Sequence, residues 1–86
     1  MMKKTIEIKG IYKGTLKGKS EKGKAWQRIN FVDTENYDNW GVFTDDEFNP
    51  ENLKNVDVGD EIDIMLSVSP SYRGVSVNVL EITPIV

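Results

Sequence analysis

Apolar and polar residues alternate with period two along most of this 86-residue chain, and no window keeps a helical period beyond about two turns. Such alternation is typical of strands that bury one face. It predicts an all-β protein with five strands, which cover residues 5–16, 25–33, 40–43, 62–68 and 75–83. Glycines at positions 10 and 14 interrupt the first strand, so we expect this strand to bend and to serve two sides of a barrel.

The alternation breaks between residues 44 and 58, where the sequence favours a helix. Asn49, Pro50 and Glu51 supply an N-cap, a first-turn proline and a first-turn acid. They predict one short helix that ends near Lys54, between the third and fourth strands. We expect this helix to plug one end of the barrel.

The alternation also assigns side chains to the two faces of each strand. In the second strand it directs Ile29 and Phe31 to the core, and Trp26, Arg28 and Asn30 to the opposite face. The last two strands supply further expected core positions, which are Ile62, Ile64, Leu66, Val68, Val75, Val77 and Val79.

The short third strand leaves two arrangements open, since either Trp40 with Val42 or Phe43 with Gly41 can face outward. We expect Trp40 to face outward, because a small barrel accommodates phenylalanine and valine inside more easily than a second indole.

Composition restricts the chemistry that this chain can perform. Its length fits one domain, residues 1–86, with a small core and no additional deep catalytic cleft. The absence of cysteine and histidine removes thiol nucleophiles, zinc–thiolate sites and the commonest general base. Residues 45–47 are three consecutive carboxylates, a pattern more typical of a solvated turn than of a metal site. We therefore expect no enzymatic activity, no cofactor, no metal and no small-molecule substrate.

No apolar stretch approaches the roughly 20 residues of a membrane span, and residues 1–7 lack the apolar run of a signal peptide. We expect a cytoplasmic protein with no membrane partner.

Charge is sorted along the chain. Residues 1–28 carry nine basic and two acidic side chains, a local charge of +7, whereas residues 29–86 carry two basic and twelve acidic ones, a local charge of −10. The segment 17–28 combines lysines with Gly18, Gly23 and Trp26. The glycines can adopt positive φ, the lysines can neutralise phosphates, and an indole offers a face for a base. Lysines at a hairpin tip can equally serve only solubility.

The order of elements resembles the oligonucleotide-binding (OB) fold, a five-stranded, partly open Greek-key barrel. Two segments strengthen the resemblance: 18–28, with the pattern Gly-Lys-x-x-x-Gly-Lys-Ala-Trp-Gln-Arg, and 58–62, Val-Gly-Asp-Glu-Ile. Both are similar to the single-stranded-DNA-binding branch of the fold, especially small phage and mobile-element proteins. The resemblance covers residues 5–83. Bacterial members usually end in an acidic tail with an aromatic tip that recruits partners, and residues 81–86 depart from that pattern.

Proteins of this branch bind single strands across the second and third strands, between the loop that joins strands one and two and the loop that joins strands four and five. The resemblance places these loops at residues 17–24 and 69–74. The candidate nucleic-acid-binding residues are Lys17, Lys19, Lys22, Lys24, Trp26, Arg28, Asn30, Trp40, Tyr72 and Arg73. Each aromatic also has a structural alternative as a packing residue, and Arg28 could pair with a carboxylate on a neighbouring strand.

We therefore expect a non-enzymatic single-stranded-DNA-binding protein with low sequence specificity, acting in replication or recombination, in the bacterial host cytoplasm if phage-encoded. Two alternatives stay open. The barrel could be a protein-binding accessory subunit whose acidic part contacts a basic partner, or it could bind RNA, because stacking and phosphate contacts hardly read the sugar. Oligomeric state is also open, since Ile82, Ile85 and Val86 could join subunits or complete the core.

Overall fold

The computed structural model describes residues 4–72 and 74–85. Apart from one short 3-10 helix it is all β, as the alternation predicted. Its elements are β1 (Lys4–Lys19), β2 (Ala25–Asp33), β3 (Asn39–Phe43), η1 (Pro50–Leu53), β4 (Glu61–Ser71) and β5 (Gly74–Pro84). No helix in this described part of the chain is long and apolar enough to span a membrane.

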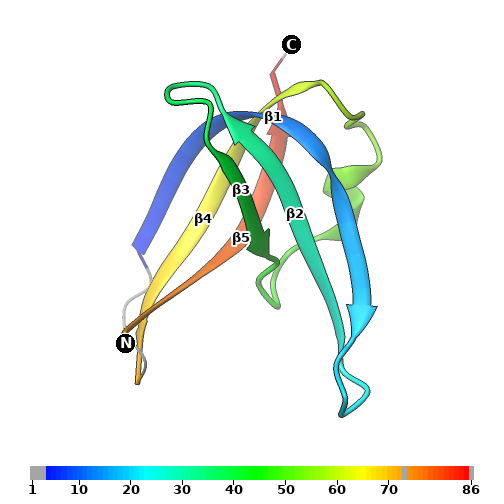
Figure 1. The fold of residues 1–86 in the computed structure, drawn as a ribbon, viewed down its shortest axis with the longest axis vertical. Helices are drawn as coiled ribbons and strands as arrows, with labels where there is room; N and C mark the ends of the chain where they lie inside the picture. Colours follow the sequence, from blue (N-terminus) through cyan, green and yellow to red (C-terminus); the bar gives the residue numbers. More distant parts are fainter. Residues whose placement is uncertain (1–3, 73, 86) are drawn as a thin grey trace.

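Five antiparallel strands form one sheet in the order β3-β2-β1-β4-β5 (Figure 1). Strand β4 returns to lie beside β1, which gives the first four strands Greek-key order. Strand β1 pairs with β4 from Lys4 to Ile11 and with β2 from Gly10 to Lys19, so it serves two parts of the sheet as expected. Its register shifts between Tyr12 and Gly14, where Gly14 adopts a φ of 115° that other residues rarely adopt.

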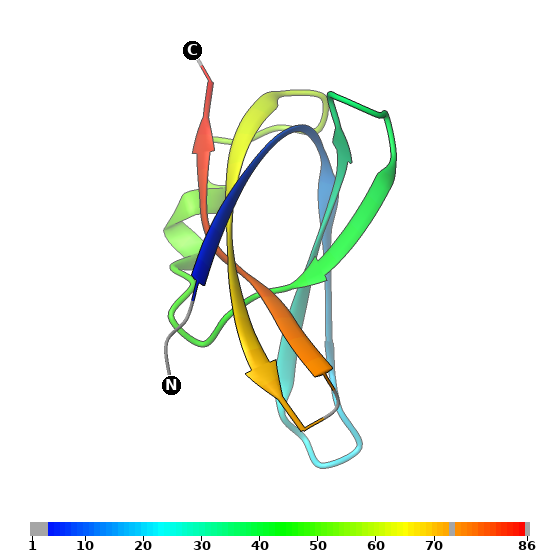
Figure 2. The same ribbon diagram turned by 90° about the vertical axis from the view of Figure 1, so that its left-hand side faces the viewer.

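The sheet coils around the core and brings its two edge strands near each other (Figure 2). Thr44 and Val79 form one isolated parallel bridge, and the Asp45 N–H donates a hydrogen bond of 2.8 Å to the Val79 carbonyl. Among the described residues no ladder joins β3 to β5, so the sheet is not closed into a barrel.

The core lies inside this curved sheet. Six of the core residues that the alternation predicted are buried: Ile29, Phe31, Ile62, Ile64, Leu66 and Val79. A seventh, Val68, is half-buried. The buried hydrophobic residues are Tyr12, Ile29, Phe31, Val42, Phe48, Val56, Ile62, Ile64, Leu66, Val79 and Ile82.

The prediction that Val75 and Val77 face the core was wrong, because they are 67% and 37% exposed. Both lie in the outer part of the β4–β5 hairpin, beyond the core. Further along β5 the register shifts, so that Leu66 pairs with Val79 and the preceding Met65 with Glu81. This bulge places Ile82 in the core.

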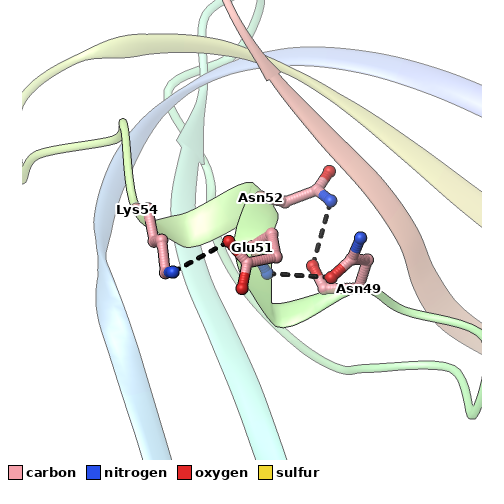
Figure 3. Close-up of polar contacts among 4 residues, drawn as sticks. All are labelled: Asn49, Glu51, Asn52 and Lys54. Carbon is pink, nitrogen blue, oxygen red and sulfur yellow. Dashed lines mark hydrogen bonds and ion pairs between the residues drawn. The ribbon is translucent and has the colours of Figure 1, made fainter.

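The predicted helix is present as the 3-10 turn η1 (Figure 3). The Asn49 side chain accepts a hydrogen bond of 3.0 Å from the Glu51 N–H, and Lys54 forms an exposed ion pair with Glu51. The Asn52 side chain accepts a hydrogen bond of 3.0 Å from the Ile82 N–H, which attaches the turn to β5. The residues that cover the core here are Phe48, Leu53 and Val56.

Candidate nucleic-acid interface

The outer face of β2 carries the three side chains that the alternation predicted there. Ile29 and Phe31 are buried, at 0% and 1% exposure, so the alternating positions Trp26, Arg28 and Asn30 face the other way. Trp26 is 36% exposed and Asn30 is half-buried.

The prediction that Trp40 faces outward was wrong. Trp40 pairs with Phe31 across β2 and β3, and the two rings stack with centroids 5.9 Å apart and planes 8° apart. Trp40 therefore lies on the inner side of the sheet, where it is 37% exposed. The prediction assumed a closed barrel with no room for a second indole, whereas the sheet is open beside β3. Phe43 faces outward instead and is 51% exposed.

Two glycines make room for large side chains on this outer face. Gly18 of β1 pairs with Trp26, and a Cβ atom at Gly18 would lie only 2.5 Å from the indole Cζ2. A Cβ atom at Gly41 of β3 would overlap the guanidinium of Arg28. The indole also meets the Phe43 ring edge to face, with centroids 5.7 Å apart. We call Trp26, Arg28 and Phe43 the aromatic platform.

The loop predicted at residues 17–24 is shorter than expected, because β1 continues to Lys19. The Ser20 N–H donates to the Lys24 carbonyl and the Gly23 N–H donates to the Ser20 carbonyl, both at 2.8 Å, so the turn is held by its own hydrogen bonds. Gly23 has the expected positive φ, at 80°. Gly18 lies in the strand without positive φ, and the close approach of Trp26 is what requires a glycine there.

The four candidate lysines are all exposed but lie on different sides of the hairpin. Lys17 and Lys19 alternate with Gly18, so they face away from Trp26. Lys22 and Lys24 lie in the turn beyond the platform. Of these four lysines, Lys24 lines a cleft together with Trp26 and Phe43.

The second hairpin, β4–β5, extends to the same end of the molecule as β1–β2 (Figures 1 and 2). Tyr72 lies at its turn and is 92% exposed. Arg73, the other candidate in this turn, lies outside the described residues.

A cleft of about 570 Å³ lies next to the platform, between the β1–β2 turn and the segment that follows β3. Its lining includes Trp26, Phe43, Phe48, Lys24, Asp46 and Asn78. Sequence reasoning missed Asp46 and Asn78 as site residues, and it left Phe43 open as an outward-facing residue while favouring Trp40. For Phe43 a signal was present, since the alternation in 40–43 allowed the arrangement with Phe43 and Gly41 outward.

The acidic turn after β2 lies at the other end of the molecule from the β1–β2 turn (Figure 1). There the Asp33 carboxylate accepts hydrogen bonds from the backbone N–H groups of Asn36, at 3.0 Å, and Glu35, at 2.6 Å. These two bonds, with a smaller contribution from the Trp40 side chain, lower the pKa of Asp33 below its ordinary value of 3.8. The β1–β2 turn and this acidic turn thus lie at opposite ends, while the carboxylate-bearing residues Asp45 and Asp46 line the cleft together with Lys24.

Comparisons with known protein families, with curated protein sequences and with solved structures found no match for this chain.

Proposed function

We propose that this chain is a non-enzymatic single-stranded-DNA-binding protein of the OB fold, with low sequence specificity, which covers strands exposed during replication or recombination. The observation that carries the proposal is the aromatic platform. Trp26, Arg28 and Phe43 share one exposed sheet face beside a lysine-bearing turn, and glycines on the neighbouring strands make room for two of them.

The strand order supports the OB part of the proposal. A meander of three strands, with β4 beside β1 and a final β4–β5 hairpin, is the order that such a barrel requires. The bridge between Thr44 and Val79 lies where β3 and β5 would complete the barrel. Closure of the barrel is part of the proposal.

The mechanism is additive. Bases stack on the exposed aromatic rings, and each stack contributes about 1–3 kcal/mol. Arg28 and the turn lysines Lys22 and Lys24 neutralise phosphates and release counterions. Neither contact reads the edge of a base, which accounts for low sequence specificity. Tyr72 on the second hairpin would supply a further stacking surface at the same end.

Single strands should be preferred to duplexes, because a duplex keeps its base faces stacked and offers the platform only phosphates. The net charge of −3 further weakens non-specific attraction to a duplex. We expect oligo-dT to bind at least about tenfold more tightly than a duplex of equal length, a difference of about 1.4 kcal/mol.

Tryptophan fluorescence titrated with oligo-dT, with a duplex and with oligo-U of equal length tests the proposal. Quenching by oligo-dT, lost with about 1–3 kcal/mol of binding free energy in a folded Trp26→Ala variant, is the expected result. Equal binding to single strand and duplex would contradict the single-strand proposal, and stronger binding to oligo-U would make RNA the ligand.

The salt dependence of binding tests the lysine assignments separately. Replacing Lys22 and Lys24 with alanine should reduce the slope of log K against log salt by about 1.4 if each contacts one phosphate of a single strand. The matched control replaces Lys17 and Lys19, which face away from Trp26, and should change the slope less. Equal effects of the two double variants would contradict this assignment.

One observation favours a protein-binding accessory role as the second candidate. Trp40 and Ile6, 37% and 48% exposed, line a second cleft that also carries the carboxylates of Asp33 and Glu35. Such a surface suits a partner with a basic and an apolar side chain. Failure to bind any oligonucleotide, together with saturable binding of a basic peptide that a Trp40→Ala variant loses, would favour this role.

A further inference from the structure

The cleft next to the aromatic platform combines features that suit a single nucleobase. Its volume of about 570 Å³ falls within the range of about 300–1,000 Å³ that is usual for small-ligand sites. Trp26 and Phe43 supply exposed aromatic surface, the buried Phe48 forms part of the wall, and Lys24 lines the cleft from the β1–β2 turn. Asp46 lines it from the segment that follows β3.

We infer that this cleft takes one unstacked base of the bound strand, and that the Asp46 carboxylate accepts a hydrogen bond from the exocyclic amino group of that base. The inference rests on the proposed function and deepens it. It predicts a preference for amino-bearing bases at one position of an otherwise unselective site.

The charges in the cleft orient the nucleotide. A phosphate is attracted to Lys24 and repelled by Asp46, so the sugar–phosphate backbone passes on the side of the turn and the base points toward the carboxylate. Aromatic surface is available to the base in that orientation, because Trp26 and Phe43 line the same cleft.

An ionised carboxylate can only accept hydrogen bonds. Cytosine, adenine and guanine each carry an exocyclic amino group that can donate one, whereas thymine has no amino group and its single donor, N3–H, lies between two carbonyl oxygens that a carboxylate repels. A carboxylate in the cleft therefore favours cytosine over thymine, two pyrimidines of similar size.

The neighbouring carboxylate has a different role. Asp45 accepts a hydrogen bond of 3.1 Å from the Ser67 hydroxyl and one of 3.0 Å from the Glu47 N–H, so it fixes the segment after β3 against β4. Asp46 is exposed. This division makes Asp46 the residue to change, since its replacement leaves the contacts of Asp45 in place.

Competition of oligo-dC and oligo-dT of equal length for the wild-type protein, at pH 8 where cytosine is neutral, tests the inference. We expect oligo-dC to bind at least about fivefold more tightly, as a hydrogen bond to a charged group allows. In Asp46→Asn the ratio should fall toward one, because oligo-dC loses the hydrogen bond to the carboxylate, whereas loss of the negative charge strengthens binding of oligo-dT. Asp38→Asn, which makes the same charge change in the turn at the other end of the molecule, should keep the fivefold ratio.

Each outcome has a separate meaning. Binding of both oligonucleotides with equal affinity, or with oligo-dT preferred, would overturn the inference and leave the proposed function intact. A cytosine preference that survives in Asp46→Asn and in Asp46→Ser would overturn the role of Asp46. Absence of binding to both would overturn the proposed function itself. Circular dichroism of each variant establishes that it is folded.

Discussion

Replacing Gly18 with alanine should separate the folding of this protein from its proposed binding activity. The added methyl group would lie 2.5 Å from Cζ2 and 2.8 Å from Cε2 of the Trp26 indole. The indole is 36% exposed and can move outward, whereas the methyl group is fixed to the strand. We therefore expect the indole to be lifted from the sheet and from its edge-to-face contact with Phe43.

Two terms of opposite sign set the effect on stability. Gly18 lacks positive φ, so alanine fits its backbone and should stabilise the strand by about 0.5–1 kcal/mol relative to glycine. Loss of the edge-to-face contact with Phe43 should cost about 0.5–1.5 kcal/mol. The free energy of unfolding should thus change by less than about 1 kcal/mol. Binding of oligo-dT depends on the indole position and should weaken by about 1–3 kcal/mol, roughly 5- to 150-fold.

Urea denaturation and fluorescence titration of the same sample measure the two effects. The matched control is Gly41→Ala, whose methyl group displaces Arg28 and leaves the Trp26 indole in place. That variant should keep the fluorescence quenching and should reduce the salt slope by about 0.7, the contribution of one phosphate contact. A folded Gly18→Ala variant with unchanged affinity and quenching would refute the platform argument.

Three further changes test other parts of the structure. In Trp40→Phe, oligo-dT should still quench the fluorescence of Trp26, because Trp40 lies on the inner face against Phe31. Loss of quenching in this variant would show that Trp40 is the responding residue. Ile64 is 0% exposed, so Ile64→Ala should destabilise the fold by about 2–5 kcal/mol. Val75 is 67% exposed, so Val75→Ala should cost less than about 0.5 kcal/mol. Equal costs in denaturation experiments would contradict the described core. The lowered pKa of Asp33 means that its ionised form stabilises the fold above about pH 4, and that this contribution is lost as the pH falls through the folded-state pKa. The difference in unfolding free energy between wild type and Asp33→Asn should therefore shrink between pH 7 and pH 3. A constant difference would contradict the hydrogen-bonding argument.

Much of the fold could be predicted from the sequence, because a strand that buries one face needs strict alternation. Ile62, Ile64 and Leu66 illustrate this, since all three are buried as predicted. Alternation cannot reveal where a strand extends beyond the core, and for that reason Val75 was misplaced. Nor can it reveal a register shift, which moved Ile82 into the core after the bulge.

The candidate site was predictable on β2 and less so on β3. Nine residues with clear alternation determined the outer face of β2, whereas β3 has only five residues and the pattern allowed either face. The decision between Trp40 and Phe43 depended on the shape of the sheet, which is a property of long-range pairing and not of local sequence. The cleft joins the β1–β2 turn, the segment after β3 and β5, and no local pattern brings these segments together.

Gly18 and Gly41 nevertheless carry a signal that is readable from the sequence once the register is known. Glycine inside a strand is unfavourable by about 0.5–1 kcal/mol relative to alanine, and these two positions lie on the outer face, where no core packing offsets that cost. Each makes room for a large side chain, Trp26 or Arg28, to lie against the sheet with part of its surface exposed. An unligated sheet gains little from this arrangement, because the strand propensity lost at Gly18 is about as large as the stabilisation from the Trp26–Phe43 contact that the glycine permits. A flat indole and guanidinium are, however, the surfaces on which bases and phosphates bind. A ligand that binds these surfaces would give the two glycines a role beyond stability, and the Gly18→Ala and Gly41→Ala variants test that role.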